Sequence, residues 1–122
     1  MSASRIEIGL EERLLRLRRE APSCSCVPAY VDDARKIRLS PKFPVALARL
    51  RALADESRLL AVALLKRREE LCACEIQAAM GLTHATVSHH MRALIDAGIV
   101  RARRDGKWMY YRLAWAPEEL LP

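Results

Sequence analysis

The segment from residue 83 to residue 95, which reads THATVSHHMRALI, constrains the fold more than any other part of the chain. Gly81 can end one helix in a left-handed conformation, and the hydroxyl of Thr83 can cap the first turn of the next. The apolar residues of the segment recur at i, i+4, i+7 and i+8 and form one buried stripe, made of Val87, Met91, Leu94 and Ile95. The pattern therefore predicts two helices joined by a tight turn.

The other edge of this second helix carries small side chains, imidazoles and one guanidinium group, without an acidic side chain among them. These residues are His84, Ala85, Ser88, His89 and Arg92. A helix with such a face can enter the DNA major groove and offer hydrogen bonds to base edges. On this segment alone, an ordinary amphipathic surface helix is an equally good interpretation.

After Gly98 the apolar pattern changes from a helical period to alternation. Residues 99–103 and 108–113 read as two strands, and the Asp105-Gly106 pair between them is a strong hairpin signal. Three cations surround the hairpin tip, where they can lie along phosphates: Arg103, Arg104 and Lys107. The order helix, turn, helix, basic hairpin is typical of a winged helix-turn-helix. The predicted class is α+β and mainly helical, with a C-terminal β-hairpin wing and an extra N-terminal helix or arm.

The chain divides into an N-terminal helix and Pro- and Cys-containing arm, residues 1–43, and the winged helix-turn-helix DNA-binding domain, residues 44–122. A leucine-rich stripe predicts a helix over 4–20, whereas Pro22, Pro28, Pro41 and Pro44 predict a break over 21–44, with a short turn or helix within 32–39. Helices are expected over 44–54, over a core segment that Asp55 caps, and over 73–80, where Ile76, Ala79 and Met80 face inward. A charged connector is expected over 66–70.

All four cysteines fall in Cys-x-Cys pairs, Cys24 with Cys26 and Cys72 with Cys74. Residues i and i+2 of a regular helix do not face each other, so Cys72 and Cys74 can reach one ion only if Cys72 precedes the helix or the first turn is unwound. A helix N-terminus also favours the thiolate. The four thiolates could hold one soft ion. A disulfide redox switch is the competing use, and a buried, inert thiol is the plainest one.

The charge balance of the 122-residue chain fits a polyanionic partner, because 21 Lys and Arg face 15 Asp and Glu and leave a net charge of +6. No apolar run approaches the ~18–20 residues of a membrane span, and the first residues do not read as a signal peptide. We therefore expect a cytoplasmic protein with reduced thiols and no membrane partner. An enzyme with a small-molecule substrate is not expected, because no phosphate loop, nucleophile triad or carboxylate pair is present.

Four stretches together resemble the ArsR/SmtB family of metal-sensing repressors: LADESRL at 53–59, ELCACEI at 70–76, TVSHHM at 86–91, and Asp105-Gly106-Lys107 followed by YYRL at 110–113. The resemblance covers roughly residues 44–114. It implies a homodimeric winged helix-turn-helix that binds operator DNA in the absence of metal and releases it when a metal or metalloid binds. It also implies that His84, Ala85, Ser88 and His89 face the major groove and that the tip from Arg103 to Lys107 is the wing.

The resemblance further implies that Cys72 and Cys74 match the metal-site cysteines of the arsenite and cadmium/lead sensors. Arsenite sensors often have a third cysteine one turn further on, where this chain has Gln77. Cadmium/lead sensors of the CadC-like type instead recruit cysteines from an N-terminal arm, usually of the other protomer, and Cys24 and Cys26 look like that arm. A Cd(II) or Pb(II) site is the first expectation, a three-thiolate As(III) site the second, and Zn(II) a further candidate.

The resemblance ends before the C-terminus, where the family usually has a long dimerisation helix. No histidine follows His90, so we expect no C-terminal zinc site, and we expect the helices at 4–20 and 44–54 to form the dimer. Metal binding next to the recognition helix would change how the DNA-reading units are held apart. A thiol-redox repressor on the same fold is the alternative.

Overall fold

A computed structural model of the chain describes residues 9–10, 12–13 and 26–122. The chain forms two compact units, Met1–Pro44 and Val45–Pro122. The four described residues at 9, 10, 12 and 13 have a helical backbone. The remainder of the predicted 4–20 helix lies outside the described residues. The division into units falls one residue after the expected boundary, and the independence of the two parts as domains stays a prediction.

The predicted break over 21–44 is wrong for most of its described part. Helix α2 runs over Cys26–Leu39, and Pro28 is its third residue. Helix α3 runs over Lys42–Leu53, and Pro44 is likewise its third residue. Backbone N–H groups in the first turn of a helix have no intrahelical partner, so proline costs little there. The break reduces to the turn that contains Pro41, where the Phe43 amide donates to the Ser40 carbonyl at 3.0 Å.

Helices α4 and α5 follow the sequence pattern closely. Helix α4 covers Glu56–Arg68, and the carboxylate of its N-cap Asp55 accepts the amide hydrogen of Arg58 at 2.9 Å. Helix α5 covers Ala73–Met80 and ends at Gly81, whose φ of 66° lies in the left-handed region that favours glycine. Of the three residues expected to face inward from α5, Ile76 is buried and Met80 partly buried, but Ala79 is exposed, which corrects the prediction.

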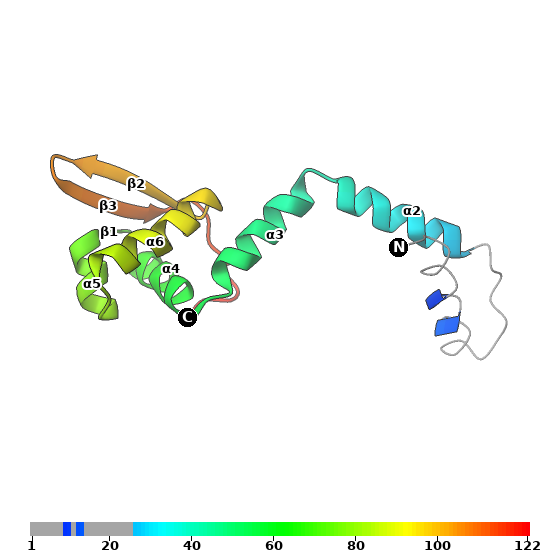
Figure 1. Cartoon of the computed structure of the whole chain (residues 1–122), viewed down its shortest axis with the longest axis horizontal. Helices are drawn as coiled ribbons and strands as arrows, with labels where there is room; N and C mark the ends of the chain where they lie inside the picture. Colours follow the sequence, from blue (N-terminus) through cyan, green and yellow to red (C-terminus); the bar gives the residue numbers. More distant parts are fainter. Residues whose placement is uncertain (1–8, 11, 14–25) are drawn as a thin grey trace. The chain divides into compact units, whose positions relative to one another are not determined.

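Helix α6 is the predicted recognition helix and covers His84–Asp96. The Thr83 hydroxyl accepts the amide hydrogen of Thr86 at 3.3 Å, which is the predicted cap. Three residues of the predicted apolar stripe are buried, namely Val87, Met91 and Leu94, whereas Ile95 is only half-buried. Figure 1 shows α6 beside the β2–β3 hairpin and next to α4 and α5.

The sheet has three antiparallel strands in the order β1-β3-β2. Strands β2, Val100–Asp105, and β3, Trp108–Leu113, form the predicted hairpin, and Gly106 turns it with a φ of 60°. Strand β1, Glu70–Cys72, was not predicted, and neither was the continuation of α4 to Arg68, so the expected charged connector is wrong. The α4–β1 junction is Glu69, a non-glycine residue with a φ of 61°.

The core of the second unit is continuous from the end of α3 to the wing. Its largest fully buried side chains are Leu65, Ile76, Met91, Leu94, Ile99, Val62 and Val87. They come from α4, α5, α6 and the residue before β2, so these elements share one interior. The architecture is the predicted mainly helical α+β winged helix-turn-helix, with a three-stranded rather than a two-stranded sheet.

Candidate nucleic-acid interface and thiol pair

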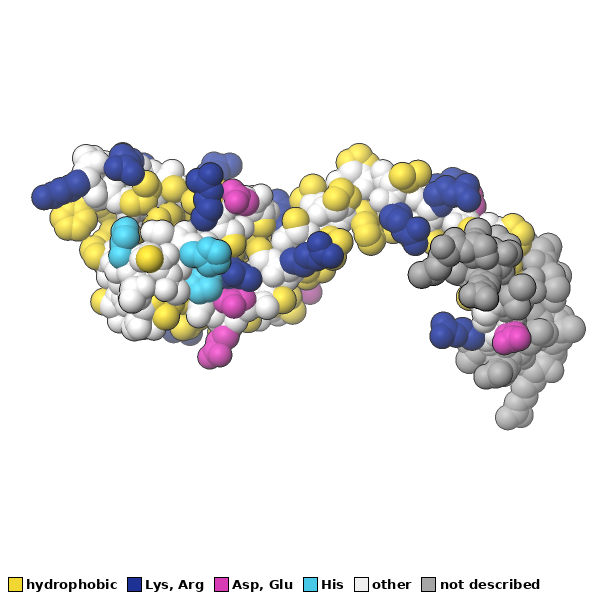
Figure 2. All heavy atoms as spheres, viewed as in Figure 1, with side chains coloured by type: hydrophobic (Ala, Val, Ile, Leu, Met, Phe, Trp, Pro, Cys, Tyr) yellow, Lys and Arg dark blue, Asp and Glu magenta, His cyan; other side chains and the backbone are white. Residues whose placement is uncertain are grey.

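The outward face of α6 carries most of the predicted base-reading residues. His84, Ala85, His89 and Arg92 are exposed and Ser88 is half-buried, while the apolar stripe behind them is buried. In Figure 2, histidine side chains and several basic side chains lie on one visible face of this unit. The Arg92 Nε atom lies 3.5 Å from an Asp96 carboxylate oxygen, but both side chains are largely exposed. Such an exposed pair is weak, so Arg92 can exchange it for a phosphate.

The wing presents two different faces. Side chains alternate along a strand, and register pairs share a face. Arg104 is paired with Met109 and Ala102 with Tyr111. Ala102, Met109 and Tyr111 line an open cleft whose other wall includes Ser88 and Arg92 of α6; Ile95 completes the lining. Arg104 therefore projects from the sheet face that looks toward the recognition helix.

Arg103 projects from the opposite face and is engaged within the sheet. Its Nη2 and Nε atoms donate to the two carboxylate oxygens of Glu70 at 2.7 and 3.3 Å, and its guanidinium lies 4.6 Å from the centre of the Tyr110 ring. The hydrogen bond from Arg103 lowers the pKa of Glu70, and the same contact raises the pKa of Arg103. A bidentate pair has a fixed geometry, so Arg103 is less available to phosphate than Arg104 or Lys107.

The second thiol pair meets the geometric condition for sharing one ion. Cys72 is the N-cap of α5 with an extended backbone, φ −79° and ψ 161°, so it precedes the helix rather than lying in its first turn. Its backbone N–H donates to the Glu75 carboxylate at 2.9 Å. The Cys74 thiol is close enough to Cys72 to contribute to the shift of the Cys72 pKa. Cys72 is buried and Cys74 is exposed.

The prediction that the helix N-terminus favours the Cys72 thiolate is wrong. Burial raises the pKa of Cys72 to about 11, and the hydrogen bond with Cys74 acts in the same direction. The thiol is therefore protonated at neutral pH. At the N-terminus of α5 the group stabilised in its charged form is Glu75 rather than Cys72. The pKa of Glu75 is lowered because its carboxylate accepts the Cys72 amide hydrogen.

The structure describes the side chains of two of the four predicted ion ligands, Cys72 and Cys74. Two adjacent thiols at one helix start suit a thiophilic ion. Cys24 lies outside the described residues, and of Cys26 only the backbone position, the first residue of α2, is described. The part of the chain that the structure describes contains no group of three or more metal-ligating side chains. A complete site thus needs ligands beyond Cys72 and Cys74.

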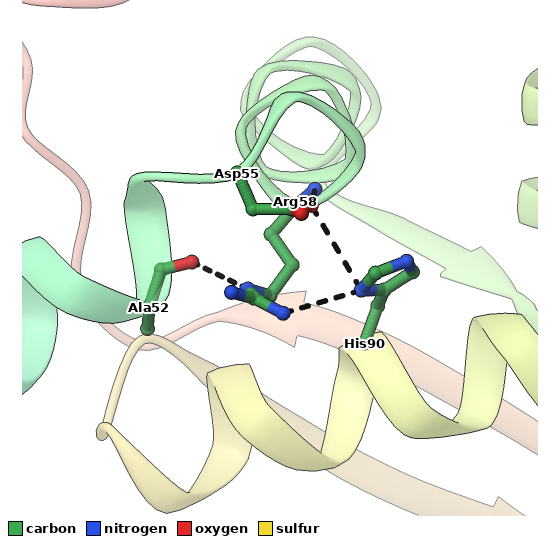
Figure 3. A network of polar contacts seen from close by, with 4 residues as sticks. All are labelled: Ala52, Asp55, Arg58 and His90. Atoms are coloured by element: carbon green, nitrogen blue, oxygen red, sulfur yellow. Dashed lines mark hydrogen bonds and ion pairs between the residues drawn. The ribbon is translucent and has the colours of Figure 1, made fainter.

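Sequence reasoning missed a polar network that joins α6 to the start of α4. The His90 side chain is 14% exposed, and its Nδ1 atom lies 3.4 Å from an Arg58 guanidinium nitrogen and 3.9 Å from an Asp55 carboxylate oxygen. The Arg58 Nε atom donates to the Ala52 carbonyl at 2.6 Å, as Figure 3 shows. In the sequence, His90 directly precedes Met91 of the apolar stripe, which favours a packed, hydrogen-bonded histidine but does not indicate its partners.

Comparison with known proteins places the chain in a family. The model of the bacterial regulatory proteins of the arsR family matches residues 55–102. The cadmium resistance transcriptional regulatory protein CadC homolog of Staphylococcus aureus is 32% identical over 93 residues, which are 72% of this chain and 77% of that protein. The chain belongs to the ArsR family of transcriptional regulators.

Two further relatives sharpen the comparison. The arsenic resistance transcriptional regulator ArsR1 of Pseudomonas putida is 43% identical over 63 residues, which are 52% of this chain and about half, 49%, of that regulator. The homodimeric winged helix-turn-helix DNA-binding domain of Mb0332 from Mycobacterium bovis, solved by NMR, is 35% identical with a TM-score of 0.55; the match covers 59% of this chain and 66% of that one.

The comparisons agree with the expectation that the chain is not an enzyme, because these relatives are named as transcriptional regulators. None of the helices among the described residues combines the length and apolar character needed to cross a bilayer.

Proposed function

We propose that this protein is a metal- or metalloid-responsive transcriptional repressor that binds operator DNA in its ion-free state and dissociates when a thiophilic ion binds its cysteines. The observation that carries the proposal is the position of the thiol pair. Cys72 and Cys74 lie where β1 passes into α5, and α5 directly precedes the recognition helix α6. Relatives named for arsenic and cadmium resistance support an ion as the signal.

In the proposed DNA complex, α6 enters the major groove and the wing follows the backbone. Base edges are contacted by His84, Ala85, Ser88 and His89, and phosphates by Arg92, Arg104 and Lys107, which are exposed. The open cleft between α6 and the wing is where a sugar-phosphate strand would pass. Arg101 and Arg103 add positive charge from the other sheet face, where Arg103 is held by Glu70.

In the proposed ion-bound state, Cys72 and Cys74 are joined by Cys24 and Cys26 of the N-terminal arm. A four-thiolate set suits Cd(II) or Pb(II), three of the same thiolates suit As(III), and Zn(II) is a further candidate. Cys72 has to lose its proton when it becomes a ligand, because burial keeps it as a thiol.

The fold offers a direct connection from these thiols to both DNA-contacting elements. Cys72 is paired in register with Tyr110 of β3, which is a wing strand, and it also caps α5. A ligand rearrangement at Cys72 would therefore disturb the wing and the helix-turn-helix corner together. Coupling free energies between sites are about 1–3 kcal/mol, equivalent to a loss of ~5–150-fold in DNA affinity.

The proposal is tested by exchanging Cys72 and Cys74 together for Ser and measuring operator DNA binding by fluorescence anisotropy. The double variant should bind DNA like the wild type and remain bound when Cd(II), Pb(II) or As(III) is added. If it still releases DNA with these ions, the ion site lies elsewhere. If the wild type ignores these ions but releases DNA with peroxide, the thiols act as a redox sensor.

We also propose that the protein acts as a homodimer in the cytoplasm. Helix α3 carries apolar residues at i, i+4 and i+7, namely Phe43, Leu47 and Leu50, and all three are exposed. The homodimeric relative from Mycobacterium bovis supports the same assembly. Sedimentation of a variant without residues 1–20 tests the contribution of the N-terminal helix, and an unchanged tight dimer would contradict it.

A further inference from the structure

Arg58 joins three elements of the second unit through one side chain. Its backbone amide donates to Asp55 and helps to cap α4, its Nε atom donates to the Ala52 carbonyl in the last turn of α3, and its Nη1 atom reaches His90 of α6 at 3.4 Å. Figure 3 shows the guanidinium between the end of α3 and the His90 ring. The planar guanidinium has several donors in a fixed fork, so one group can hold two acceptors at once.

The contact with His90 defines a protonation state for that histidine. Arginine only donates hydrogen bonds, so the Nδ1 atom of His90 has to act as an acceptor, and the ring has to be neutral with its proton on Nε2. A protonated ring would bring a second cation to the guanidinium at 3.4 Å. It would also turn a donor toward the Asp55 carboxylate, which lies 3.9 Å away and already caps α4.

The charged and titratable groups around His90 come from two elements. Helix α4 and its cap provide Arg58 and Asp55, and α6 provides His89, whose ring centre is 5.8 Å from that of His90. Helix α5 and strand β2 also pack on α6, and within the described residues neither forms a hydrogen bond or ion pair with His90. The His90 side chain is 14% exposed, and Arg58 and Asp55 are the charged groups nearest to its Nδ1 atom.

We propose that Arg58 and neutral His90 are positioning residues for DNA recognition. Through this contact Arg58 fixes the rotation and depth of α6 relative to α3 and α4. His89, a proposed base-reading residue, directly precedes His90, so any movement of His90 moves a DNA contact with it. The inference rests on the proposed DNA-binding function and adds residues that lie behind the DNA-contacting face rather than on it.

The contact is tested with variants that keep or remove one property at a time. His90→Asn keeps an acceptor near the Nδ1 position but does not titrate, and His90→Leu removes the acceptor. Arg58→Lys keeps the charge but cannot hold the Ala52 carbonyl and His90 together. Thermal unfolding of each variant establishes that it is folded, and operator DNA affinity is measured by anisotropy at about pH 8 and about pH 5.5, on either side of the ordinary histidine pKa.

At about pH 8, His90→Asn should bind DNA within about threefold of the wild type, while His90→Leu and Arg58→Lys should bind about tenfold more weakly, as expected for one charged hydrogen bond. Lowering the pH also changes charges that the wild type and the variants share. The ratio of wild-type to His90→Asn affinity removes this common effect. We expect that ratio to fall at about pH 5.5, because His90 is the titratable group that the variant lacks and a protonated ring cannot accept the Arg58 hydrogen bond.

The possible results separate the inference from the proposed function. If the wild type does not bind operator DNA at either pH, the proposed function fails. If it binds, but all variants bind equally, or the wild-type to His90→Asn ratio is the same at both pH values, the positioning role alone is overturned.

Discussion

Helices α3 and α6 have nearly the same length and both carry an apolar stripe, but they use it differently. The stripe of α6 is buried within its own chain, with Leu94 fully inaccessible. The stripe of α3 is exposed, and Leu50 retains 58% of its accessible surface. A helix is stabilised in water mainly by packing its apolar face. Within the second unit α6 has this packing, whereas among the described residues nothing covers the stripe of α3.

The same contrast recurs at the sites proposed to bind ligands. Arg103 is held by Glu70 and Tyr110, whereas its neighbour Arg104 projects toward the recognition helix. Cys72 is buried beside Glu75, whereas Cys74 is exposed two residues later. Side chains that the fold uses internally therefore alternate with side chains that it offers to a second molecule.

The largest expected effect separates α6 from α3. Leu94→Ala should destabilise the folded unit by about 2–5 kcal/mol, because it removes a fully buried side chain and leaves a cavity. Leu50→Ala should change the stability of the isolated protomer by only about 0.5 kcal/mol or less, because its side chain is already exposed. Urea unfolding, followed by circular dichroism at a protein concentration low enough to keep protomers apart, measures both.

The matched pair also tests the use of α3 in a dimer. At high concentration the Leu50 variant should lose stability and the dimer should weaken in sedimentation, because burial of Leu50 then comes from a second copy. Equal destabilisation of both variants at low concentration would contradict the contrast between the helices.

The two thiols of the Cys72 pair should differ in reactivity. In a Cys24→Ser, Cys26→Ser background, iodoacetamide should modify Cys74 at least about tenfold faster than Cys72 at pH 8, because the thiolate is the nucleophile and burial protects Cys72. The pKa of Cys72 is about 11. Its modification rate should therefore rise about tenfold per pH unit and level off near that pKa.

Mass spectrometry of peptides after timed quenching measures both rates. Unfolding in urea provides the control, because it should make the two cysteines react at similar rates. A faster Cys72 in the folded protein would mean that its thiolate is favoured after all.

The smallest expected effect separates the two wing arginines. Arg104→Ala should weaken DNA binding about threefold to tenfold and reduce the slope of log affinity against log salt by about 0.9, the value for one phosphate contact. Arg103→Ala should leave the slope nearly unchanged, because Arg103 is engaged by Glu70. Affinities measured by anisotropy across a salt series give both slopes. An equal reduction of the slope in both variants would place both arginines on phosphate, and no reduction in the Arg104 variant would contradict the prediction.

Local sequence determined most of the helix-turn-helix and the hairpin. The Asp55 and Thr83 caps, the Gly81 stop and the Asp105-Gly106 turn each depend on the conformational preference of one or two residues, so they could be read without tertiary structure. The stripe of α6 was readable for the same reason, because its period matches a helix over thirteen residues.

Features that depend on contacts between distant parts of the chain could not be predicted from the local sequence pattern. Strand β1 exists because Leu71 and its neighbours pair with β3, forty residues later in the chain. The contacts of Arg58 with His90 and of Arg103 with Glu70 join residues more than thirty positions apart. Burial of Cys72, which sets its pKa, likewise depends on packing. Caps and periods are local properties of the backbone, whereas burial and long-range pairing arise only when separate elements pack together.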